Sequence, residues 1–256
     1  MFTKAIVRAP CSNFAAGLTS VDLGLPDFER ALVQHEAYCK ALESCGLEII
    51  RLAPDEEHPD STFVEDTAVL TPRGAIITRP GAASRQGETT SVVPVVREHF
   101  ADVRFIREPG TVDGGDVCEA GEHFFIGISE RTNPAGAEQL ASALESFGYS
   151  SSLIDIRGTG NILHLKSGLA YLGGKILLVI DAFREEEEFC GYELLFANYP
   201  EGYAANCLQV NDKVLLAAGF EDTRWKLEHS GYQTIALDMS EFQKMDGGLS
   251  CLSLRF

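Results

Sequence analysis

Short apolar runs alternate with polar stretches that contain glycine or proline along the whole chain. Apolar runs of this kind, rich in Val, Ile, Leu and Phe and bounded by turn residues, are typical of strands. We expect strands at residues 5–7, 47–52, 75–77, 103–106, 123–127, 175–180 and 213–217.

Other segments place their apolar residues at helical spacing instead. The longest covers residues 26–45, and Gly46 directly after it is a typical helix-stop residue. A second helix is expected at about 88–100. A third begins at Pro134, with Asn133 as its cap and Gly148 at its end.

These elements recur as a unit of an apolar strand, a turn, often a helix, and another strand. Successive units are roughly 40 to 50 residues apart, in the range of radial or stacked repeats. About five units fit the 256 residues, and no low-complexity linker divides them. We therefore predict one α/β domain over residues 1–256, built from βαβ-like blades around a central site. The alternative is a doubly wound sheet, but the glycine fingerprint of such sheets is missing.

The charge of the chain narrows the class of partner. Asp and Glu outnumber Lys and Arg by 38 to 21, which gives a net charge of −17. Such a surface repels phosphate, so we expect no nucleic-acid partner, and it attracts cationic small molecules. The alternative is that the acidity only keeps the protein in solution.

Membrane and disulfide signals are both missing from the sequence. No apolar run approaches the roughly 20 residues that a membrane span needs, so we expect no membrane partner. The seven cysteines are an odd number without close paired spacing, which favours neither a disulfide framework nor a zinc ribbon. We expect a reducing, cytoplasmic setting.

Two acidic groups are candidates for a site. Glu65 and Asp66 follow apolar residues, so at least one carboxylate is expected to be buried and to need a cation. That cation is either a guanidinium ligand or an internal arginine. In a second group, Asp113 and Asp116 bracket two glycines before a strand resumes. The alternative for this group is a simple Asp-Gly turn.

Cys251, His164 and an acid such as Asp113 would complete a nucleophile, base and orienter set. Cys251 follows two glycines and enters what we expect to be the final strand, and His164 interrupts a strand-like stretch at residues 161–168. The alternatives are a buried strand cysteine and a satisfied core histidine. A metal site is less favoured, because no second histidine or cysteine lies at ligand spacing.

Two arginines, Arg85 and Arg131, lie just before predicted helices. In so acidic a chain, their default role is a surface ion pair. Their loop position also suits a guanidinium fork that binds the carboxylate of a substrate.

Taken together, these segments resemble the guanidine-modifying enzyme superfamily, and most closely its dimethylarginine dimethylaminohydrolase family. The resemblance covers nearly the whole chain. It rests on short motifs in a shared order: Gly17-Leu18-Thr19-Ser20, Phe63-Val64-Glu65-Asp66, Arg79-Pro80-Gly81, Gly114-Gly115-Asp116, Arg131-Thr132-Asn133, His164-Leu165-Lys166, Ala204-Ala205-Asn206-Cys207 and Asp246-Gly247-Gly248 with Cys251.

The resemblance implies a five-bladed α/β propeller of ββαβ-like units around a central active site. It implies Cys251 as the nucleophile, His164 as acid and base, and Asp113 as the orienter of His164, a role that Asp116 could share. The implied substrate-binding residues fall into three groups: Asp60, Glu65 and Asp66 at the guanidine end, Arg85 and Arg131 at the α-carboxylate, and the backbone of Leu18 and Met245 beside the amino-acid portion.

The implied reaction is hydrolysis of N-omega-methylated arginine to citrulline and a methylamine through a covalent cysteine thiouronium, without metal or organic cofactor. The partner is a cationic amino-acid substrate, and a homodimer is implied by the resemblance alone. Arginine deiminases typically carry His-x-Asp where this chain has Lys166, which favours an alkylated substrate. An arginine or agmatine deiminase and a non-catalytic methylarginine-binding protein stay open as alternatives.

Overall fold

A computed structural model of the protein describes residues 1–160 and 162–256. Within these residues the strands form five three-stranded sheets. The strands are β1 Lys4–Arg8, β2 Glu48–Leu52, β3 Ala68–Thr71, β4 Gly74–Ile77, β5 Val103–Phe105, β6 Val117–Ala120, β7 His123–Ile128, β8 Ser150–Asp155, β9 Leu169–Tyr171, β10 Ile176–Ile180, β11 Glu193–Ala197, β12 Leu208–Val210, β13 Lys213–Ala217, β14 Gln233–Leu237 and β15 Leu254–Arg255.

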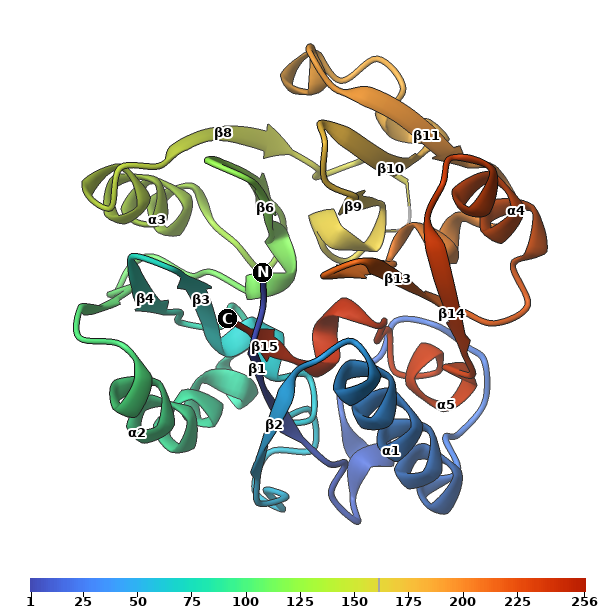
Figure 1. The fold of residues 1–256 in the computed structure, drawn as a ribbon. Helices are drawn as coiled ribbons and strands as arrows, with labels where there is room; N and C mark the ends of the chain where they lie inside the picture. The colour runs from blue at the N-terminus through green and yellow to red at the C-terminus, as the bar shows by residue number, and fades with distance from the viewer. Residues whose placement is uncertain (161) are drawn as a thin grey trace.

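All five sheets share one topology, with the orders β15-β1-β2, β3-β4-β5, β6-β7-β8, β9-β10-β11 and β12-β13-β14. In each sheet the middle strand is antiparallel to the first and parallel to the third. Figure 1 shows the sheets arranged around a common centre, in chain order around the ring. The prediction of a five-bladed α/β propeller is therefore confirmed.

The first sheet joins the two ends of the chain. β15 pairs with β1, with Ala5 opposite Arg255 and Ile6 opposite Leu254. Both termini lie near the centre of the ring (Figure 1). The last strand thus completes a sheet that the first strand began.

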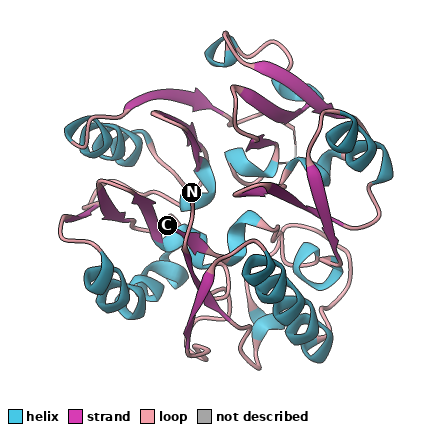
Figure 2. Ribbon diagram, viewed as in Figure 1, coloured by secondary structure: helices cyan, strands magenta, loops and turns pink. Residues whose placement is uncertain are grey.

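The longer helices connect the parallel strands and lie on the outside of the ring (Figure 2). In α1, the Asp27 side chain caps the helix by accepting from the backbone N–H of Arg30, and the apolar face buries Tyr38 and Leu42. None of the described helices is long and apolar enough to cross a bilayer. The helices are α1 Phe28–Ser44, α2 Thr89–His99, α3 Pro134–Ser146, α4 Glu221–His229 and α5 Ser240–Gln243.

Two expected strands near the candidate site are wrong. Cys251 lies in the 3₁₀ turn Ser250–Leu252, and β15 begins only at Leu254. The side chains of Leu249 and Leu252 are both buried, and this three-residue spacing suits a turn. The stretch 161–168 is not a strand either, because His164 precedes the turn Leu165–Ser167. Asn161, the first residue of that stretch, lies outside the described residues.

Candidate active site

Five short 3₁₀ turns, one before the first strand of each sheet, form what we call the turn ring. Its members are Val64–Thr67, Gly114–Asp116, Leu165–Ser167, Gly202–Ala205 and Ser250–Leu252. Val64–Thr67 contacts Gly114–Asp116 and Ser250–Leu252, and Leu165–Ser167 contacts Gly114–Asp116 and Gly202–Ala205. The sheets of the propeller therefore bring together the six candidate residues that lie within or beside these turns: Glu65, Asp66, Asp113, Asp116, His164 and Cys251.

One pocket, with a volume of about 30 Å³, holds most of the predicted site. We call it the site pocket. Eight of the ten predicted residues line it, and Asp113 and Glu65 are the other two. The lining residues are Leu18, Asp60, Phe63, Asp66, Arg85, Arg131, Leu163, His164, Met245, Asp246, Gly247 and Cys251.

Cys251 presents a half-buried thiol to the site pocket. Burial, together with the negative charges of Glu65 and Asp66, raises the pKa of this thiol to about 12, although the backbone N–H of Gly248 opposes the shift. At neutral pH the sulfur therefore carries its proton. Because a nearby cation favours the thiolate, a cationic ligand in the pocket would lower this pKa.

His164 is oriented by Asp113. The distance from His164 Nε2 to Asp113 Oδ2 is 3.0 Å, and the second carboxylate oxygen accepts from the backbone N–H of Gly81 at 2.8 Å. The carboxylate of Asp116 accepts instead from the backbone N–H of Leu165 at 2.9 Å and from a serine hydroxyl. Asp113 thus holds the imidazole, and Asp116 holds the backbone next to it.

Gly115 leaves room for the imidazole. A Cβ at this position would lie 2.8 Å from Cγ and Nδ1 of His164 and 3.1 Å from Oδ1 of Asp66. The backbone N–H of Gly115 also donates to Asp66 Oδ1 at 2.8 Å. Gly115, the second glycine of the pair in the sequence, therefore allows Asp66 and His164 to approach the backbone closely.

The imidazole of His164 is protonated at rest. Burial disfavours its charge, but Asp66, Asp116 and the hydrogen-bonded Asp113 outweigh burial and raise the pKa of His164 to about 9. A proton is therefore available on this side chain for a leaving group at neutral pH.

This shift predicts a fall in stability with rising pH. The folded-state pKa of His164 lies above its unfolded value of about 6.5. Its stabilising contribution is complete below pH 6.5 and is lost as the pH rises from 6.5 through 9. Over this range the folded state binds more protons than the unfolded state, so raising the pH favours unfolding. Urea unfolding at pH 6, 7.5 and 9.5 should show a steeper decline for the wild type than for His164→Gln. Parallel declines would contradict the assignment.

Asp66 and Arg85, which both line the site pocket, form a buried ion pair. Arg85 Nη1 donates to Asp66 Oδ2 at 2.6 Å, and its Nε and Nη2 donate to both oxygens of Glu88 at 2.9 Å. Burial opposes the Asp66 charge, but Arg85, protonated His164 and the Gly115 N–H lower the pKa of Asp66 to about 2. Asp66 therefore remains ionised, with an internal arginine as its cation.

The default surface role expected for Arg85 is wrong, because its side chain is only 7% exposed. Most of its donors are committed to Glu88 and Asp66, which leaves little of the guanidinium fork for a ligand. Glu88 went unnoticed in the sequence. Its position three residues after Arg85, at the start of a helix, is the signal that could have revealed this pair.

Arg131 is the more available cation. Its side chain lines the site pocket and has no ion-pair partner among the residues that the structure describes. Leu18 also lines the site pocket, and its backbone N–H donates to Asp60 at 3.0 Å. Asp246, which also lines the pocket and adopts a left-handed φ of 57°, accepts from the backbone N–H of Ser20. These contacts fix the loop that contains Leu18 and Ser20 at the wall of the pocket.

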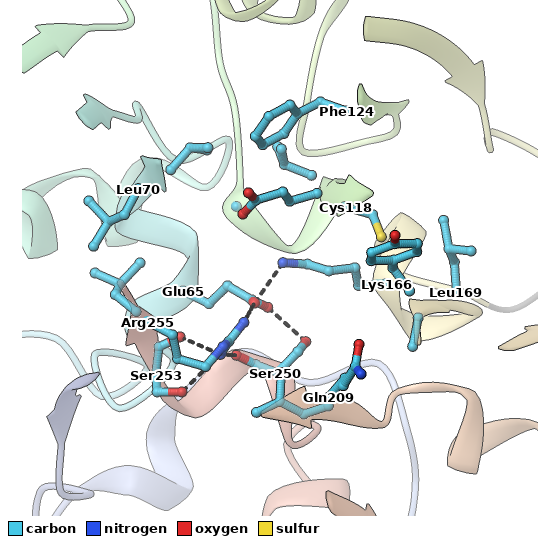
Figure 3. A pocket seen from close by; sticks show the side chains of 18 of the residues that line it. Glu65, Leu70, Cys118, Phe124, Lys166, Leu169, Gln209, Ser250, Ser253 and Arg255 are labelled. Atoms are coloured by element: carbon cyan, nitrogen blue, oxygen red, sulfur yellow. Dashed lines mark hydrogen bonds and ion pairs between the residues drawn. The ribbon is translucent and has the colours of Figure 1, made fainter. Parts of the chain in front are cut away.

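Glu65 faces a different cavity. Lys166 Nζ lies 2.6 Å from Glu65 Oε1, and the Ser250 hydroxyl donates to Oε2 at 2.8 Å. All three residues line a second cavity of about 280 Å³ at the centre of the propeller, where Figure 3 shows these contacts beside Arg255. Glu65 therefore points away from the site pocket, and its contact with a substrate remains a prediction.

Comparisons with known proteins show which sequences and folds this chain resembles. A family model described as arginine deiminase matches residues 56–192. The N(G),N(G)-dimethylarginine dimethylaminohydrolase of Pseudomonas aeruginosa is 46% identical over 257 residues, covering 100% of both chains. A structure of that enzyme from P. aeruginosa, a cysteine-to-serine mutant complexed with citrulline, matches with a TM-score of 0.97, 46% identity and 100% coverage of both chains.

A second solved structure shows a histidine-to-glycine variant of a dimethylarginine dimethylaminohydrolase as an adduct with S-methyl-L-thiocitrulline. It matches with a TM-score of 0.97 and 46% identity, again over 100% of both chains. Identity of this extent over the full length shows the family. This chain belongs to the dimethylarginine dimethylaminohydrolase family.

Proposed function

We propose that this protein hydrolyses N-omega-methylated arginine to citrulline and a methylamine. The observation that carries the proposal is the site pocket itself, where a thiol, a protonated imidazole and an ionised buried carboxylate meet beside an available arginine. The full-length similarity to dimethylarginine dimethylaminohydrolases supports the same substrate class.

The first half-reaction forms a covalent intermediate. Asp66 and Asp60 hold the guanidinium over Cys251, and this positive charge favours release of the thiol proton to water. The thiolate attacks the central guanidinium carbon. His164 then gives its proton to the methylated nitrogen, the C–N bond breaks, and the amine leaves an S-linked thiouronium on Cys251.

The second half-reaction consumes water. His164, now neutral, takes a proton from a water molecule that attacks the thiouronium carbon. The C–S bond breaks, the electron pair returns to the sulfur, the remaining hydroxyl proton passes to the thiolate, and citrulline leaves. Asp113 keeps the imidazole oriented through both steps, because it accepts a hydrogen bond from Nε2 of His164. The other ring nitrogen, Nδ1, is then the one that exchanges protons with the substrate and water.

Citrulline release tests the reaction and its substrate. Asymmetric dimethylarginine and arginine are offered separately to the purified protein, and we expect turnover of the methylated substrate alone. Turnover of arginine would move the assignment to a deiminase, a reading that the arginine deiminase family model also allows. Saturable binding without turnover of either would leave a methylarginine-binding protein.

Arg131 should set the affinity for the α-carboxylate. Because a charged hydrogen bond contributes about 1.5–3 kcal/mol, Arg131→Met should raise KM for dimethylarginine roughly 10- to 100-fold with a smaller effect on kcat. Steady-state kinetics measure both constants. Arg157→Met is the matched control, since Arg157 is exposed and pairs only with Asp155 among the described residues. An unchanged KM for Arg131→Met would remove Arg131 from substrate binding.

The remaining assignments concern the whole chain. Residues 1–256 act as one catalytic domain, because the turn ring draws on all five sheets. A cytoplasmic location is supported by the seven free cysteines. The active form is a homodimer, which rests on family resemblance and is tested by light scattering of the purified protein.

A further inference from the structure

One member of the turn ring has no part in the reaction described above. The turn Gly202–Ala205 ends at Asn206, and neither lines the site pocket as the structure describes it. The other four turns contain or adjoin Asp66, Asp113, His164 and Cys251. The buried amide of Asn206 is therefore a polar group without an assigned role.

This amide joins the turn of the nucleophile to the turn of the histidine. Asn206 Nδ2 donates to the backbone oxygen of Lys166 at 2.9 Å and to Ser250 Oγ at 3.0 Å. Its Oδ1 accepts from the backbone N–H of Ser250, also at 3.0 Å. Lys166 lies two residues after His164, and Ser250 directly precedes Cys251. Both donors and the acceptor of one side chain thus hold the two turns together.

The backbone before the nucleophile is shaped for this contact. A Cβ on Gly248 would lie 2.4 Å from Asn206 Oδ1 and 2.5 Å from its Cγ. Only glycine lets this segment approach the amide so closely. The backbone N–H of Gly248 in turn favours the thiolate form of Cys251. The contact with Asn206 therefore places a donor beside the sulfur.

We infer that Asn206 is a positioning residue that holds the turn carrying Cys251 against the turn carrying His164 without touching the substrate. The effect of Asn206 on turnover rests on the proposed function. Its effect on the thiol is independent of the substrate, because two of the three hydrogen bonds join Asn206 to the backbone N–H and the hydroxyl of Ser250, the residue directly before Cys251.

Asn206→Ala should slow the chemical step more than it weakens binding. A displacement of reacting groups by about 1 Å costs on the order of 100-fold, so we expect kcat to fall roughly 10- to 100-fold while KM changes less than about threefold. The rate at which 2-chloroacetamidine alkylates Cys251 should fall with kcat. Asn206→Asp keeps the acceptor for the Ser250 N–H and should retain more activity than Asn206→Ala.

Asn211→Ala is the matched control. The Asn211 side chain also makes three hydrogen bonds, all of them to the backbone of Phe2 and Cys45, but it lies outside the site pocket. This variant should lose thermal stability and keep kcat. Wild-type kcat and alkylation in Asn206→Ala, or equal losses of kcat in both variants, would overturn the inference. If Asn206→Ala does not fold, Asn206→Asp is tested in its place. A wild-type kcat in Asn206→Asp would then overturn the inference.

The two proposals fail in different ways. If the wild type releases no citrulline, the proposed function is wrong, and the alkylation rates of the wild type, Asn206→Ala and Asn211→Ala still test the positioning role. If the wild type is active and Asn206→Ala matches it, the positioning role alone is wrong.

Discussion

Replacing Cys251 by serine should lower citrulline release by at least about 10⁴-fold, because removing a nucleophile forfeits the whole covalent route. Serine has nearly the same size, so the turn Ser250–Leu252 and the site pocket should persist. A hydroxyl does not ionise even beside a guanidinium, whereas the thiol does. Initial rates measure the loss, and calorimetry should show that dimethylarginine still binds.

Cys190→Ser is the control for this experiment. Cys190 is exposed and does not line the site pocket, so its replacement should leave the rate unchanged. The buried thiols of Cys118 and Cys207 are poor alternatives as nucleophiles, because both line the central cavity and not the site pocket that contains His164. Residual turnover above one per cent in Cys251→Ser would place the nucleophile elsewhere.

Asp113→Asn should lower kcat by roughly 10³- to 10⁴-fold, the scale seen when a carboxylate that orients a catalytic histidine becomes an amide. A carboxamide both donates and accepts, so it no longer dictates which ring nitrogen of His164 carries a proton. It also removes a charge that stabilises the imidazolium. Citrulline release over a range of substrate concentrations gives kcat and KM separately.

Asp116→Asn gives the comparison that separates the two acids. Asp116 accepts from the Leu165 N–H and from Ser129 Oγ, and it is completely buried. Its replacement should lower the free energy of unfolding by about 1–3 kcal/mol while kcat changes less than about tenfold. Equal losses of kcat in the two variants would contradict the assignment of Asp113 as the orienting acid.

Local sequence signals predicted the three longest helices and the middle strand of every sheet, but not most of the outer strands. The helix expected at residues 26–45 is α1 Phe28–Ser44, and the cap expected at Asn133 accepts from the backbone N–H of Gly136. The count of five units was also correct, because each unit carries its own strand, turn and strand pattern. These features depend on residues close to one another in the chain.

The turn ring could not be predicted in the same way. The segment around His164 has a strand-like pattern, but the Leu165 N–H bonds to Asp116, which lies 49 residues earlier. The pairing of Lys166 with Glu65 joins different sheets and leaves no local signal. The sequence therefore indicated which side chains take part, whereas the backbone that presents them depends on contacts between blades.

The position of β15 ties chemical competence to the integrity of the whole ring. The nucleophile lies three residues before a two-residue strand whose partner is at the other end of the chain. Local opening of that short pairing would release the thiol from its neighbours while most of the protein stayed folded. The catalytically competent state then lasts only as long as the least stable sheet stays paired. A sample with native helix content could therefore still contain inactive molecules.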